Sequence, residues 1–142
     1  MHFNVLAILS LANIVSASAI LETSSSLAIL SKRAAYSCKG NTLCGSTANL
    51  RTWCDNTVNN KIIRNDVVNY GPPGSGLPSG GCTGNVAGFG CGVFVEGNSG
   101  CTMSGNAIWW AYQDIRNSGC QICGQADFGN GCYLTIDRVS SC

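Results

Sequence analysis

The sequence predicts an α+β fold: a disulfide-rich two-layer α/β sandwich in which an antiparallel sheet carries two helices on one face. Three observations support this prediction. Two segments have helical periodicity, and strand-like segments are interleaved with them. No glycine-rich phosphate turn follows a strand, which argues against a doubly wound sheet. All ten cysteines lie between residues 34 and 142, at a density typical of a disulfide scaffold.

The start of the chain resembles two segments that are removed on secretion. Residues 1–19 are expected to be a signal peptide, because a short apolar run is followed by small residues that end at Ala19. Residues 20–33 would be a pro-peptide that ends in the dibasic pair Lys32-Arg33, although an ordinary solvated charge pair is the alternative. Residues 34–142 then form one domain. A signal peptide before ten cysteines predicts a secreted, extracellular protein.

The stretch from Ser104 to Gly124 predicts the main packing helix. Ser104 can cap its start and Gly119 can end it in a left-handed conformation. One face is apolar at helical spacing and comprises Ile108, Ala111, Tyr112 and Ile115.

A second helix is predicted to begin at Ser46 or Thr47 and to end at Asn59-Asn60. One side of it carries Leu50, Trp53, Cys54 and Val58. Residues 61–70 fit either a strand or a helix tail. Residues 71–81 hold three prolines and five glycines, which predicts a loop without regular structure.

Three segments favour strands. These are Tyr36 to Lys39, Gly88 to Glu96, and Cys132 to Val139. In the last of them, alternation predicts that Leu134 and Ile136 face the core.

The residue types argue against catalysis. The only histidine is His2, inside the predicted signal, so residues 34–142 hold no Ser-His or Cys-His pair. The six acidic residues are scattered singly, and nothing in the sequence brings two of them together. We therefore expect a protein that is not an enzyme and that needs no cofactor or metal. Basic and acidic residues balance in this part, so nucleic acid is not an expected partner, and we expect a monomer.

The motif Cys120-Gln-Ile-Cys123 has three interpretations. A redox pair normally begins a helix, whereas this one follows a helix and a glycine. A structural zinc would need a second pair at similar spacing, which Cys38 and Cys44 do not supply. Structural disulfides are favoured. Ten cysteines allow roughly 945 pairings, among which spacing cannot choose.

Trp109-Trp110 could form a platform for a sugar or a membrane. Adjacent helical positions point about 100° apart, so at most one ring is expected to be wholly buried. A core residue beside a partly exposed one is the favoured interpretation.

Four features together resemble the killer protein 4 family, the small secreted toxins first known from smut fungi. They are the dibasic processing site, Cys38-Lys-Gly-Asn-Thr-Leu-Cys44-Gly, Asn117-Ser-Gly-Cys120-Gln-Ile-Cys123-Gly, and the ending Tyr133-Leu-Thr-Ile-Asp-Arg-Val-Ser-Ser-Cys142. The resemblance covers most of residues 34–142. It implies the same sandwich, and a toxin that inhibits calcium uptake through channels of target cells.

The resemblance also bears on the cysteines and the active surface. It implies that Cys38 and Cys44 bridge to Cys120 and Cys123. Cys132 stands where the family pattern has none, while a cysteine near Ile108 is missing, which implies one rewired bridge. The other cysteines expected in disulfides are Cys54, Cys82, Cys91, Cys101 and Cys142.

Residues 83–90 carry no charge, whereas the best-known member has basic residues just before the cysteine that matches Cys91. The candidates for a channel-binding surface are therefore the remaining basic residues Lys39, Lys61 and Arg64. The expected partner is a membrane protein of a target cell, such as a calcium channel. The alternative is a secreted fungal effector of the same fold that binds a host protein or a cell-wall glycan without catalysis.

Overall fold

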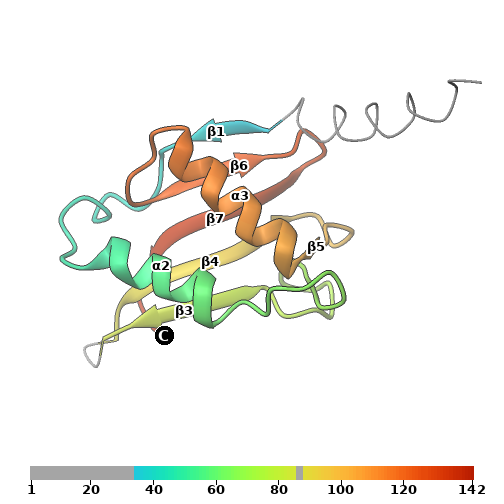
Figure 1. Ribbon diagram of the computed structural model, residues 1–142, viewed down its shortest axis with the longest axis horizontal. Coiled ribbons are helices and arrows are strands. Elements are labelled where there is room, and N and C mark those ends of the chain that lie inside the picture. Colours follow the sequence, from blue (N-terminus) through green and yellow to red (C-terminus); the bar gives the residue numbers. More distant parts are fainter. Residues whose placement is uncertain (1–33, 86–87) are drawn as a thin grey trace, which may run out of the picture. The chain divides into compact units, whose positions relative to one another are not determined.

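The computed structural model describes residues 34–85 and 88–142. The predicted signal peptide, the pro-peptide and the processing pair Lys32-Arg33 lie outside these described residues. A five-stranded antiparallel sheet in the order β1-β6-β7-β4-β3 forms one layer, and helices α2 and α3 cover one face of it (Figure 1). The α+β, disulfide-rich fold predicted from the sequence is confirmed.

The centre of the sheet is the pair of long strands β4 (Gly90–Gly97) and β7 (Cys132–Val139). Val93 lies opposite Ile136 and Val95 opposite Leu134, and all four side chains are fully buried on the face that the helices cover. Because side chains alternate between the two faces of a strand, this register also fixes which residues point away from the helices.

Helix α3 (Gly105–Asn117) begins and ends as predicted. The hydroxyl of Ser104 accepts a hydrogen bond from the amide of Ala107, and Gly119 has a positive φ of 102° just after the last turn. The predicted apolar face is buried, namely Ile108, Ala111, Tyr112 and Ile115.

Helix α2 (Leu50–Asn60) starts later than predicted. Thr47 lies in a turn instead, where its amide and its hydroxyl both donate to the carbonyl of Leu43. Asn49 then takes a left-handed conformation with a φ of 61°, which a helical residue cannot have. The predicted start at Ser46 or Thr47 is therefore wrong, because side-chain hydrogen bonding stabilises the turn in place of a first helical turn.

The remaining strands are short, and of these only β1 overlaps a strand predicted from the sequence, at Tyr36 to Lys39. The edge strands are β1 (Ala35–Ser37) and β3 (Gly80–Gly84), β6 (Gly124–Asp127) follows the C-x-x-C motif, and β2 (Asn69–Tyr70) pairs with β5 (Met103–Ser104). Strand β3 begins inside the predicted loop 71–81. A Cβ on Gly80 would lie 2.0 Å from the carbonyl oxygen of Val93, so glycine allows the two backbones to approach.

Residues 61–68 are neither strand nor helix. They fold against the start of α3 through backbone hydrogen bonds from Gly105 to Val68 and from Asn106 to Asn65. Of the helices that the structure describes, none is long and apolar enough to cross a bilayer.

Candidate functional site

The loop between β1 and α2 is fastened by two disulfides. Cys38 is bonded to Cys120 and Cys44 to Cys123, which agrees with the pairs that the resemblance implies. Both sulfurs of the C-x-x-C motif are thus bonded to partners elsewhere in the chain. The prediction of structural disulfides at this motif is confirmed.

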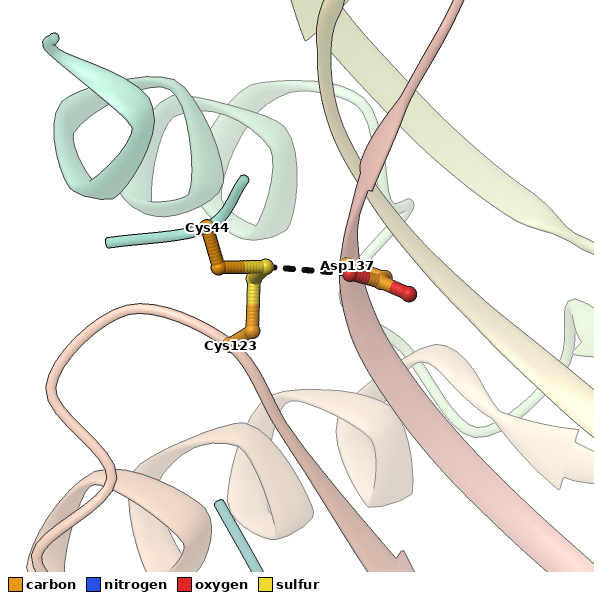
Figure 2. Close-up of side chains that lie close together, drawn as sticks. All are labelled: Cys44, Cys123 and Asp137. Atoms are coloured by element: carbon orange, nitrogen blue, oxygen red, sulfur yellow. Dashed lines mark hydrogen bonds between the residues drawn. A yellow bond between two sulfur atoms is a disulfide. The ribbon is translucent and has the colours of Figure 1, made fainter. Parts of the chain in front are cut away.

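A carboxylate fastens the same loop at a third point (Figure 2). Oδ1 of Asp137 accepts hydrogen bonds from the backbone amides of Asn41, at 2.8 Å, and of Arg138, at 2.7 Å. It also lies 3.1 Å from Sγ of Cys44. A disulfide sulfur has no proton to donate, so this last contact is a close polar approach. Asp137 thereby connects β7 to a loop that lies far from it in the sequence.

The side chains of Cys44, Cys123 and Asp137 offer atoms within 4.8 Å of one another. Sulfur binds metals as a thiolate, and here the two sulfurs are bonded to each other. While the bridge is intact, the carboxylate of Asp137 is the one anionic group of the three, and its Oδ1 already accepts two backbone hydrogen bonds. The cluster therefore acts as a structural fastening of the loop.

Lys39 lies on this fastened loop, directly after Cys38, and is exposed. Its backbone amide donates to the hydroxyl of Ser37 at 3.3 Å. Among the residues that the structure describes, no ion pair engages its ammonium group. The loop thus presents a solvated positive charge from a backbone held at three points.

A polar network holds the segment that carries Cys120 and Cys123, the partners of Cys38 and Cys44 in the two bridges. Nη1 of Arg116 donates to the carbonyls of Cys120, at 3.0 Å, and Ile122, at 2.6 Å, and its Nη2 donates to the hydroxyl of Tyr112. Tyr112 in turn donates to Asp55 of α2. Burial, followed by the hydrogen bond to Asp55, raises the pKa of Tyr112 well above its usual range, although Arg116 acts in the opposite direction.

A second surface combines a cation with aromatic rings. The guanidinium of Arg64 lies 4.0 Å from the ring centroid of Trp109, whose indole nitrogen donates to Asn59 at 3.3 Å. Trp110 meets Trp109 edge to face at 4.8 Å and is 64% exposed. Trp109 is half-buried, so neither ring is wholly buried. We call Arg64, Trp109 and Trp110 the Arg64 surface.

The structure separates the three sequence-predicted basic residues. The contacts of Trp109 with Asn59 and of Tyr112 with Asp55 show that the helices run antiparallel. Lys61 caps the C-terminal end of α2, near the Arg64 surface. Lys39 belongs to the loop that precedes α2, at the other end of the helix pair. The candidates therefore form two sites.

Three further bridges complete the scaffold. The buried bridge Cys54–Cys91 joins α2 to the sheet, and Cys82–Cys142 joins β3 to the C-terminus. Cys132, the departure from the resembled pattern, is bonded to Cys101 just before β5 and α3. All ten cysteines are paired, as is typical of proteins that fold in an oxidising, extracellular environment.

Comparison with known proteins gives one family. Residues 36–142 match the meiotically up-regulated gene family. No curated protein matches the chain. The description of the family names neither a ligand nor a reaction, so the chain's own surfaces carry the argument about function.

Proposed function

The chain belongs to the meiotically up-regulated gene family, and from its own surfaces we propose that it is a secreted killer-toxin-like protein that inhibits growth of competing fungal or host cells. It would act by binding, without catalysis, to a membrane protein of the target cell. A calcium channel is the proposed target, as the resemblance to the killer protein 4 family implies.

The observation that carries this proposal is the solvated charge of Lys39 on a loop fastened by Cys38, Cys44 and Asp137. A channel mouth that concentrates cations also attracts an ammonium group, and a single lysine can act there as a point charge. A rigid backbone lowers the entropy that would be lost on binding. The two bridges that fasten the loop thus favour binding as well as folding.

The test is growth inhibition of fungal cultures by the purified secreted protein, with and without added calcium chloride. We expect inhibition that calcium relieves. Lys39→Gln should lower the potency about tenfold, the effect of losing one interfacial charge contact, and Lys39→Arg should retain most of it. Lys61→Gln is the matched control, because it removes the same charge at the other end of the helix pair. Absence of inhibition, or full potency of Lys39→Gln, would contradict the proposal.

The Arg64 surface favours a second candidate, an effector that binds a host protein. Exposed tryptophan beside arginine is the composition of interface hot spots, and Trp110 is the most exposed aromatic side chain among the described residues. Trp110→Ser should then abolish the biological effect while Lys39→Gln leaves it intact. Leu77→Ser is the matched control, since it removes an exposed apolar side chain elsewhere. The reverse outcome would favour the toxin.

A further inference from the structure

A pocket of about 290 Å³ lies between the turn that precedes α2 and the last residues of β7. Its lining includes Ser46, Thr47, Asn49, Trp53, Phe89 and Arg138. The pocket belongs to neither surface described above. Its size is at the lower end of the range for small-molecule sites, which suits a ligand of about one sugar unit.

Arg138 is the one charged residue among those that line the pocket. It lies opposite Cys91 in the register of β4 and β7, and Cys91 is bonded to Cys54 of α2, so Arg138 points to the helix-covered face. Its Nε donates to the hydroxyl of Thr47 at 3.2 Å, and its guanidinium lies 4.9 Å from the ring centroid of Phe89.

These contacts leave one side of the Arg138 guanidinium, the side with its two terminal nitrogens, available to a ligand. The N–H groups of a guanidinium lie in its own plane, and only Nε of Arg138 has a hydrogen-bond partner among residues 34–85 and 88–142. The two terminal nitrogens have no hydrogen-bond partner in that part of the chain, and their geometry suits a bidentate interaction with a carboxylate. The hydrogen bond to Thr47 and the cation–π contact with Phe89 restrict the guanidinium before a ligand binds.

The remaining lining residues suit a hydroxylated ring. Trp53 and Phe89 meet edge to face at 5.8 Å, and the half-buried Trp53 offers an aromatic surface. The C–H groups of a pyranose carry partial positive charge and are attracted to the negative face of such a ring. Ser46 and Asn49 add polar groups for the sugar hydroxyls. The hydroxyl of Ser46 donates to the carbonyl of Leu43, so its oxygen can accept from the sugar, whereas the amide of Asn49 can both donate and accept. The backbone of Asn49 is left-handed, with a φ of 61°.

We propose that this pocket binds a sugar acid: a single pyranose ring that carries one carboxylate. The carboxylate would pair with the terminal nitrogens of Arg138, the ring would stack on Trp53, and the hydroxyls would bond to Ser46 and Asn49. This proposal is independent of growth inhibition, since it concerns another surface. A glycan that contains such a sugar acid would then be the chemical class that the protein recognises.

The test is calorimetric titration of the purified secreted protein with five probes: D-glucuronate, D-galacturonate, D-glucose, D-galactose and acetate. We expect one of the uronates to bind at least tenfold more tightly than its neutral counterpart, because a charged hydrogen-bonded pair is lost in the neutral sugar. Acetate should bind more weakly than that uronate, since it lacks the ring. Added salt should weaken binding of the uronate and leave binding of the neutral sugars unchanged.

Three variants assign the binding to this pocket. Arg138→Gln should remove the preference for the acid, and Arg138→Lys should keep part of it. Asn49→Gly removes the amide but permits the left-handed backbone, so it should weaken acid and neutral sugar alike. Arg64→Gln is the matched control and should bind as the wild type does. Circular dichroism confirms that each variant is folded.

The proposal would be overturned by equal affinities for acid and neutral sugar, or by acetate binding as tightly as the uronates. It would also be overturned by unchanged uronate binding in folded Arg138→Gln and Arg138→Lys, or by no saturable binding of either uronate at millimolar concentration. Each result can be obtained whether or not the protein inhibits growth.

Discussion

The phenol oxygen of Tyr112 lies 2.5 Å from Oδ1 of Asp55, and this partly buried hydrogen bond joins the two helices. The same oxygen accepts from Nη2 of Arg116 at 2.7 Å. Arg116 in turn bonds to the loop that carries Cys120 and Cys123. One phenol group therefore connects α2, α3 and the loop that fastens Lys39.

The first prediction concerns this connection. Tyr112→Phe should lower the free energy of unfolding by about 2 kcal/mol, because it removes hydrogen bonds to two charged groups, the carboxylate of Asp55 and the guanidinium of Arg116. Urea unfolding monitored by circular dichroism measures the change. Tyr36→Phe is the control, since its hydroxyl contacts Asp114 at 3.5 Å on the surface, and it should cost less than about 0.5 kcal/mol. Equal losses in the two variants would contradict the prediction.

The second prediction concerns alkaline pH. The folded protein raises the pKa of Tyr112 above the unfolded value near 10, so the folded state keeps a proton that the unfolded state loses. The stability that this group contributes is therefore complete below about pH 10 and is lost as the pH rises toward the folded pKa. Urea midpoints measured across this range should fall more steeply for the wild type than for Tyr112→Phe. Parallel profiles would show that another group is responsible.

The third prediction compares two glycines. A Cβ on Gly105 would lie 1.8 Å from the carbonyl oxygen of Ile63, whereas a Cβ on Gly45 would meet nothing within 4 Å. Gly105→Ala should destabilise the protein by about 1–3 kcal/mol, because the clash with backbone exceeds the gain in helix propensity. Gly45→Ala should be neutral or slightly stabilising. Thermal unfolding distinguishes them, and a neutral Gly105→Ala would show that residues 61–68 can move away from α3.

The fourth prediction concerns the paired bridges Cys38–Cys120 and Cys44–Cys123. While one is intact, the other closes only a small ring, so its removal alone should cost about 2.5 kcal/mol in the chain-entropy model. Removing the second bridge then opens a loop of 79 or 82 residues, which the intact Cys54–Cys91 bridge shortens, and should cost about 4 kcal/mol more. Guanidinium unfolding of the two single-bridge variants and the double variant measures this. A double variant that loses only the sum of the two single losses would contradict it.

The sequence by itself determined the elements whose signal is local. The limits and buried face of α3, and the alternation of β7 with Leu134 and Ile136 inside, follow from periodicity and from capping by Ser104 and Gly119. The fold class follows from the order of such elements. Disulfide formation follows from the high density and even number of cysteines, which can be seen without knowing which of them pair.

Only the tertiary structure decided which distant residues meet. Asp137 reaches a bridge sulfur 93 positions away, and Arg138 reaches Thr47 across 91 positions, and neither contact has a local signal. The late start of α2 and the strand β3 were also settled this way, since a turn at Thr47 and close backbone approach at Gly80 overrode the local pattern. The physical reason is that periodicity indicates which face of a helix or strand is buried. Which residue packs against that face depends on the register between strands that are distant in the sequence.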